Sequence, residues 1–209
     1  MITDRRRLGS GGEAALVRRV AVAARAGVQL VQIRERDLDG GPLLRLVERC
    51  VDAVRGTRTR VLVNDRLDVA LAAGAHGVHL RADSMPAARV RRVVPAGFLI
   101  GRSVHAAGQA QRVAAEGGAD YLIFGPVFAT ASKPGQSPAG LQALASVVAA
   151  TTLPVLAVGG ITPETASGLA ETGAAGAAAI GLFGDSDDEA LQVVVPALNR
   201  AFDTHQRLP

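Results

Sequence analysis

Residues 60–80 read Arg60-Val-Leu-Val-Asn-Asp-Arg-Leu-Asp-Val-Ala-Leu-Ala-Ala-Gly-Ala-His-Gly-Val-His-Leu80. The stretch begins and ends with short apolar runs, 60–63 and 77–80, which are too short for helices and too uniformly apolar for a sheet with one wet face. Between them, 66–73 has helical spacing, and Gly74 stands where a left-handed residue commonly ends a helix. Two buried strands joined by a helix are typical of a parallel sheet.

The same alternation continues along the whole chain. Further apolar runs lie at 28–33, 98–101, 121–124, 154–158 and 177–180, and further helical segments lie at 12–26, 42–54, 85–94, 107–116, 141–150, 165–172 and 187–202. The pattern leaves a place for one more strand at Met1-Ile-Thr-Asp4, which is so short that we expect a clipped first strand. We therefore predict that residues 1–209 form a single (β/α)8 TIM-barrel domain. A doubly wound open sheet is the alternative, but no Gly-x-Gly-x-x-Gly turn follows the first strand.

Composition excludes several classes of protein. Aromatic residues make up 3% of the chain and Trp is absent, which argues against base stacking on single-stranded nucleic acid. The longest basic run, Arg5-Arg-Arg7, is too short to indicate a nucleic-acid site. Cys50 is the only cysteine, so we expect a buried structural thiol and no disulfide framework. No apolar run approaches the roughly 18 residues of a membrane span, and we predict a cytoplasmic protein that binds neither nucleic acid nor membrane.

In a barrel, the residues that follow the strands converge at one face and carry the chemistry. Here they are mostly basic or hydroxylic: Arg34, Arg36, Asn64, Asp65, Arg81, Asp83, Ser84, Arg102, Ser103, His105, Thr130, Ser132, Lys133, Gly159, Gly160 and Gly181. Such a set suits a phosphorylated small molecule with a divalent metal ion.

Two features of this set point to phosphate. Lys133 is the only lysine among 23 Lys and Arg residues, and a point charge on a loop of hydroxyls favours an anion clamp, with an ordinary surface charge as the alternative. A Schiff-base lysine would instead belong within a strand. The pair Gly159-Gly160 can offer backbone N–H groups to a phosphate, or form a plain tight turn.

Seven motifs occur in order along the chain: Val31-Gln-Ile-Arg-Glu35, Val63-Asn-Asp-Arg66, Gly77-Val-His-Leu80, Ile100-Gly-Arg-Ser-Val-His105, Gly118-Ala-Asp-Tyr121, Phe124-Gly-Pro-Val-Phe128 with Ser132-Lys-Pro-Gly135, and Val158-Gly-Gly-Ile161. With these motifs the chain resembles the thiamine phosphate synthase/TenI family along nearly its whole length. It implies a TIM barrel, usually a homodimer, that joins hydroxymethylpyrimidine pyrophosphate to thiazole phosphate with Mg2+ and releases pyrophosphate.

The resemblance also implies roles for individual residues. Lys133, Arg34 and Ser103 would be catalytic, and Asp65 would bind Mg2+, with Asp83 as a second candidate because Ser84 occupies the usual Asp position. The substrate-binding set would be Gln32, Arg34, Arg36, Asn64, Ser103, Thr130, Ser132, Lys133, Gly159, Gly160, Ile180 and Gly181.

Departures from the synthase pattern keep other functions open. Ser84, with Arg81-Ala82 before it, leans toward the TenI thiazole tautomerases, although the position of their catalytic His is Pro126 here. His105 is the one histidine near the predicted mouth that could serve a tautomerase as acid and base, or it could simply be a hydrogen bonder at a helix start. A homologue that binds thiazole phosphate without catalysis is the third alternative. We favour the synthase because Asn64, Asp65, Thr130, Ser132 and Lys133 are present together.

Overall fold

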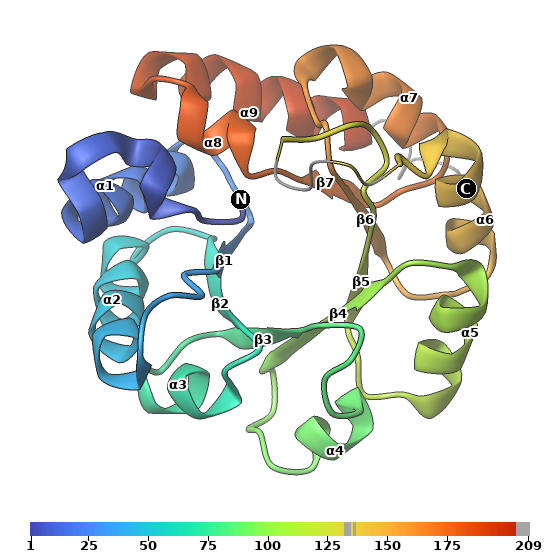
Figure 1. Cartoon of the computed structure of the whole chain (residues 1–209), viewed down its shortest axis with the longest axis horizontal. Coiled ribbons are helices and arrows are strands. Elements are labelled where there is room, and N and C mark those ends of the chain that lie inside the picture. The colour runs from blue at the N-terminus through green and yellow to red at the C-terminus, as the bar shows by residue number, and fades with distance from the viewer. Residues whose placement is uncertain (132–134, 136, 204–209) are drawn as a thin grey trace. The chain divides into compact units, whose positions relative to one another are not determined.

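The computed structural model describes residues 1–131, 135 and 137–203 (Figure 1). Its contacts divide the chain into two compact units. The first comprises Met1–His79, Pro95–Leu99 and Ile180–Pro196, and the second comprises Leu80–Val94, Ile100–Ala179 and Ala197–Pro209. The single domain stays a prediction.

The first unit is built on three parallel strands, β1 (Leu30–Ile33), β2 (Arg60–Asn64) and β3 (Gly77–Leu80), paired in chain order. The register places Val31 beside Val61, and both side chains are buried. The outer side is covered by α1 (Gly12–Arg25), α2 (Gly40–Ala53) and α3 (Leu67–Ala72) (Figure 1). The same unit contains the 3-10 helix η1 (Arg5–Gly11) and α8 (Gly181–Asp185), while α9 (Asp188–Asp203) runs from it into the second unit.

The predicted first strand is reduced to a single bridge. Ile2 pairs with Gln32 in parallel, and the Thr3 backbone N donates to Gln32 O at 3.0 Å. The Gln32 backbone N donates in turn to Met1 O at 2.9 Å. The first residues therefore lie beside β1.

The second unit contains β4 (Leu99–Val104), β5 (Tyr121–Phe124), β6 (Val155–Val158) and β7 (Gly176–Ala178), again parallel and in chain order. Helices α5 (Ala107–Glu116) and α6 (Gly140–Ala149) lie outside these strands (Figure 1). The unit also contains α4 (Ala87–Arg91), the 3-10 helix η2 (Pro163–Thr165) and α7 (Ala166–Glu171). The described chain is thus an α/β protein with seven parallel strands.

Most element positions follow the sequence pattern, with differences at the two ends of the chain. Gly74, which was predicted to end a helix, has positive φ, and so do Gly27, Gly117 and Gly173 at the ends of three other helices. The prediction that the last strand extends to Ile180 was wrong, because β7 ends at Ala178 and Ile180 caps α8. Neither η1 nor α8 was predicted. The two helices are connected by a hydrogen bond from Arg7 on η1 to Asp185 on α8, at 2.9 Å.

Two further predictions concern single features. Cys50 is a buried free thiol on α2, as predicted, and burial raises its pKa to about 12. Among the described residues, we find no helical segment with the length and hydropathy needed to span a bilayer.

One close contact in the second unit depends on a glycine. Gly118 has φ +87°, and a Cβ added there would lie 2.6 Å from the Ala88 backbone N. Nearby, Asp120 Oδ2 accepts from Ile100 N and from Arg91 Nη2, each at 2.6 Å, and Arg91 also donates to Gly118 O. The polar groups that join α4 to the start of β4 therefore have partners, and the packing leaves no room for a side chain.

We expect Gly118→Ala to destabilise the fold by about 1–3 kcal/mol, because it combines a strained φ with a backbone clash. Urea unfolding followed by circular dichroism would measure the loss. Gly97→Ala is the matched control, since Gly97 has φ +78° but nothing within 4 Å of the added Cβ. Equal losses at the two positions would show that the clash contributes nothing.

Candidate functional site

In the first unit, two amide side chains meet at the ends of β1 and β2. Gln32 Nε2 donates to Asn64 Oδ1 at 2.9 Å. The other end of the Gln32 amide, Oε1, is buried and accepts no hydrogen bond from any described residue. A buried acceptor without a donor costs about 1–3 kcal/mol, so this oxygen marks a place where a ligand could donate.

Asp65 follows Asn64 directly and has an unusual backbone conformation. Its φ of 59° is the only positive value among the described residues other than glycine. Its backbone N donates to His79 O at 2.9 Å, which joins the end of β2 to β3. A left-handed aspartate stores strain, and such strain is common at functional sites.

Two guanidinium groups follow β1. Arg34 is half-buried and Arg36 is exposed, and neither side chain forms a hydrogen bond or ion pair that joins it to another described residue. Burial lowers the pKa of Arg34, and the neighbouring charge of Arg36 lowers it further. Because neither guanidinium is held in an ion pair within the described chain, the end of β1 is suited to bind an anion.

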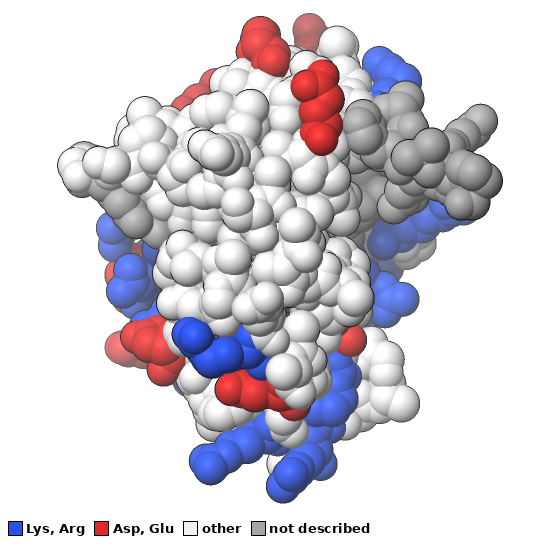
Figure 2. Space-filling model, turned by 90° about the vertical axis from the view of Figure 1, so that its right-hand side faces the viewer, with Lys and Arg blue, Asp and Glu red and all other residues white. Residues whose placement is uncertain are grey.

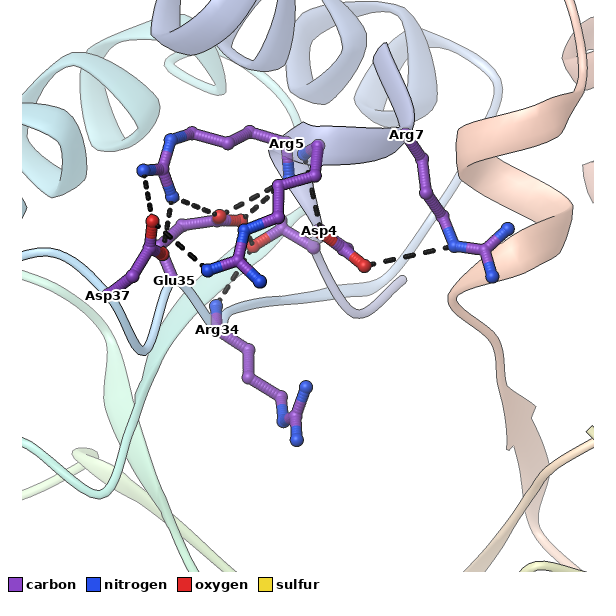
Figure 3. Close-up of polar contacts among 8 residues, drawn as sticks. Asp4, Arg5, Arg7, Arg34, Glu35 and Asp37 are labelled. Carbon is purple, nitrogen blue, oxygen red and sulfur yellow. Dashed lines mark hydrogen bonds and ion pairs between the residues drawn. The ribbon is translucent and has the colours of Figure 1, made fainter. Parts of the chain in front are cut away.

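Beside Arg34 lies a cluster of ion pairs, which we call the N-terminal ion cluster: Asp4, Arg5, Arg6, Arg7, Glu35 and Asp37 (Figure 3). Arg5 donates to Glu35 Oε2 at 2.9 Å and to both oxygens of Asp37 at 2.7 and 2.6 Å. The hydrogen bonds from Arg5 hold the pKa of Asp37 well below its usual range. The Arg34 side chain points away from this cluster (Figure 3).

In the second unit, Arg102 on β4 organises the loop after β3. Its buried guanidinium donates to three backbone oxygens, those of Met85 at 2.6 Å and of Ala82 and Ser84 at 3.0 Å each. In the same loop, Arg81 holds both oxygens of Asp83, at 2.9 and 2.7 Å. This pairing lowers the pKa of Asp83.

Other predicted site residues of the second unit lie at strand ends. Ser103 is half-buried on β4, and Thr130 is half-buried in the loop after β5. Gly159 and Gly160 have φ of 100° and 65°, and a Cβ on Gly160 would lie 2.5 Å from Phe128 Cβ. The backbone passes so close to residues 126–129 that only glycine fits at these two positions. His105 Nδ1 lies 3.1 Å from Gly125 O.

The remaining predicted residues divide between the first unit and the undescribed part. Ile180 and Gly181 are half-buried at the start of α8, in the first unit. Ser132 and Lys133 lie outside the described residues, so their roles stay predictions from the sequence. The sequence analysis gave no role to Arg5 or Glu35, and it placed Arg102 among the residues at the strand ends without predicting its contacts to the loop after β3. The run Arg5-Arg-Arg7 was noted only as basic, and nothing in it indicated partners some 30 residues away.

Comparison with known proteins decides the family. A family model described as thiamine monophosphate synthase matches residues 1–183. The chain belongs to this family. It is 44% identical to a protein named thiamine-phosphate synthase from Methanoculleus marisnigri over 168 residues, 79% of each chain. It is also 40% identical to a thiamine-phosphate synthase from Roseiflexus castenholzii, over 91% of this chain and 82% of that protein.

A solved structure agrees. The fold matches that of thiamine phosphate pyrophosphorylase from Pyrococcus furiosus with a TM-score of 0.82 and 29% identity, covering 98% of this chain and 94% of that one. The resemblance predicted from the seven motifs is thereby confirmed.

The depressed pKa of Asp37 predicts how the N-terminal ion cluster responds to acid. The Arg5–Asp37 pair stabilises the folded state fully above the ordinary aspartate pKa, and that contribution is lost as the pH falls toward the lower folded value. We therefore expect Asp37→Asn to lower the melting temperature most above about pH 5 and to have a shrinking effect below about pH 4. Thermal melts across this range measure it, and about 1 M NaCl should reduce the difference at every pH. A constant difference would contradict the ion-pair origin.

Proposed function

We propose that the chain is a thiamine phosphate synthase, which joins hydroxymethylpyrimidine pyrophosphate to thiazole phosphate and releases pyrophosphate. Family membership and the names of the relatives support the activity. The observation that connects this activity to particular residues is the buried oxygen Gln32 Oε1, on β1, the strand that Arg34 and Arg36 follow. A substrate with an aminopyrimidine ring and an anionic tail has a donor for this oxygen and a negative charge for the two guanidinium groups.

The first unit supplies matching groups for the pyrimidine substrate. Its exocyclic amine can donate to Gln32 Oε1, and a ring nitrogen can accept from the Asn64 amide, whose oxygen is already bonded to Gln32. Arg34 and Arg36 would hold the pyrophosphate through charge-assisted hydrogen bonds.

The reaction requires stabilisation of the leaving group. The bond between the pyrimidine methylene carbon and the pyrophosphate oxygen breaks first, and the pyrophosphate keeps the electron pair. The thiazole nitrogen then gives its lone pair to the resulting pyrimidine cation. The guanidinium groups of Arg34 and Arg36 would favour this order, because negative charge grows on the pyrophosphate before the new bond forms.

The resemblance assigns further roles that we include in the proposal. Ser103 and Thr130 in the second unit, with Ser132 and Lys133, would bind the pyrophosphate. Backbone groups of Gly159, Gly160, Ile180 and Gly181 would bind the thiazole phosphate. These assignments come from the matched motifs.

Mg2+ fits the described residues only in part. No group of three His, Cys, Asp or Glu side chains among them could hold a metal ion, and both oxygens of Asp83 are engaged by Arg81. Mg2+ commonly binds through one or two carboxylates together with substrate phosphates. We propose that it enters with the pyrophosphate and that Asp65 is its protein ligand. When bound, it would neutralise charge on the leaving group.

We also propose the complete (β/α)8 barrel and a cytoplasmic location for this chain. The strict alternation of strands and helices supports the barrel, and the Ile2 bridge beside β1 supplies the place of an eighth strand. The cytoplasmic location rests on the sequence alone.

A thiazole tautomerase is the second candidate, and His105 is the observation in its favour. If Nδ1 donates its proton to Gly125 O, Nε2 is left as a proton acceptor. The purified protein should therefore receive both synthase substrates with Mg2+ and, in parallel, the thiazole carboxylate phosphate tautomer alone. Thiamine phosphate formation supports the synthase, tautomer conversion supports the isomerase, and tight binding of thiazole phosphate without product indicates a binding homologue.

Lys133→Ala should lower the rate of thiamine phosphate formation by about a hundredfold or more, the scale for losing one donor to a developing charge. Steady-state kinetics with both substrates measures it. His105→Asn is the matched control, because the synthase mechanism gives His105 no proton to move. A loss below about threefold at Lys133, or an equal loss at His105, would contradict the clamp.

We further propose that the chain forms a homodimer through the face that contains α6. Residues 121–163 contain one charged side chain, Lys133, and the middle of the face seen in Figure 2 shows almost none. Interface cores are depleted in charge in this way. A second copy of the same chain is the occupant that the family resemblance implies.

Sedimentation velocity should therefore give twice the chain mass. Ala149→Arg, at an exposed position of α6, should shift the protein toward monomer, since it places a charge in the proposed interface. Leu71→Arg is the control at an exposed apolar position on α3, and it should leave the mass unchanged. A monomer in the unmodified protein would contradict the proposal.

A further inference from the structure

The segment after β1 places acids and bases side by side. It reads Arg34-Glu-Arg-Asp37, with two guanidinium groups and two carboxylates in consecutive positions. Opposite charges this close attract strongly where they are partly shielded from water. An Arg34 paired with Glu35 or Asp37 would lose much of its affinity for an external anion.

That pairing does not occur. Glu35 and Asp37 form ion pairs with arginines from before β1, and no described residue forms a hydrogen bond or ion pair with the Arg34 guanidinium. The guanidinium extends away from both carboxylates (Figure 3). Neither of the carboxylates next to Arg34 in the chain is therefore paired with its guanidinium.

Arg5 is the residue that binds both carboxylates. Its Nη1 bridges them, at 2.9 Å from Glu35 Oε2 and 2.7 Å from Asp37 Oδ1, while Nη2 lies 2.6 Å from Asp37 Oδ2. The Arg5 backbone N adds contacts of 3.2 Å to each oxygen of Glu35. The Glu35 side chain is only 2% exposed, so Arg5 compensates a carboxylate that water scarcely reaches.

Thr3 connects this arrangement to the backbone of Arg34. Its hydroxyl donates to Glu35 Oε1 at 2.6 Å and accepts from the Arg34 backbone N at 2.9 Å. The same two segments thus fix the position of Arg34 and occupy the carboxylates that could neutralise it.

We propose that Arg5 is a positioning residue that sequesters Glu35 and Asp37 and thereby leaves Arg34 available to bind an anion. The inference rests on the proposed function, because pyrophosphate is the anion that Arg34 would hold. Arg5 itself does not contact the substrate. Its contribution is to remove the two competing anions nearest to Arg34 in the chain.

The test is calorimetric titration of the purified full chain with inorganic pyrophosphate. Arg5→Gln should weaken binding by about tenfold or more, the scale for losing a partner that orients a ligand-binding group. Arg55→Gln is the matched control, because it removes the same charge from an exposed pair with Asp52 on the same unit, and its affinity should not change. Should Arg5→Gln fail to fold, Arg5→Lys serves instead, since a point charge cannot bridge both carboxylates and binding should still weaken.

A triple variant separates sequestration from simple anchoring. Arg5→Gln with Glu35→Gln and Asp37→Asn removes the competing carboxylates, so sequestration predicts that affinity recovers to within about twofold of the unmodified protein. If Arg5 acts only by holding the start of the chain against β1, the triple variant should bind pyrophosphate more weakly than Arg5→Gln does. Thermal melts confirm that each variant is folded.

The outcomes also separate this inference from the proposed function. Unchanged affinity in Arg5→Gln, or a triple variant weaker than Arg5→Gln, overturns the role of Arg5. Pyrophosphate binding without thiamine phosphate formation in the unmodified protein overturns the synthase while Arg5 keeps its role. An unmodified protein that does not bind pyrophosphate overturns both.

Discussion

The first unit depends on the compensation of one buried carboxylate. Glu35 is 5% exposed, and its oxygens accept from the Thr3 hydroxyl, the Arg5 backbone and the Arg5 side chain. An ion removed from water destabilises a fold unless nearly all of its hydrogen-bonding capacity is used. Thr3 and Arg5 supply these partners, which holds the start of the chain against the end of β1. The Ile2 bridge to Gln32 follows from the same attachment.

Polar groups have partners where a helix packs against a strand, but some of them lack partners at the strand ends of the candidate site. Where α4 meets the start of β4, Asp120 has two donors and Arg91 has a carboxylate and a carbonyl. At the ends of β1 and β2, by contrast, Gln32 Oε1 lacks a described donor and Asp65 has a strained φ. Unsatisfied and strained groups cost stability, and their occurrence at these strand ends supports the candidate site that we propose there.

The sequence was informative wherever structure is set by neighbouring residues. The strand cores and the positive φ of Gly27, Gly74 and Gly117 follow from local apolar runs and from the tolerance of glycine for left-handed backbone. Helices η1 and α8 escaped prediction because distant contacts stabilise them, such as the Arg7–Asp185 pair across 178 positions. The site was predicted as a set of residue types, but their pairing was not. Which carboxylate Arg5 binds depends on the fold.

The sequence does not show which carboxylates and which guanidinium groups are already paired within the protein. Asp65 and Asp83 look equivalent as carboxylates in the sequence, yet the Arg81 fork occupies both oxygens of Asp83. Arg5 and Arg34 look equivalent as guanidinium groups, yet Arg5 is bound to two acids and Arg34 to none of the described ones. In a chain with 19 acids and 23 Lys and Arg residues, most charges can find a partner, so charge alone identifies no site. We propose instead that a site is identified by a charge whose nearest opposite neighbours are bound elsewhere. Arg34 meets that condition because Glu35 and Asp37 are bound by Arg5.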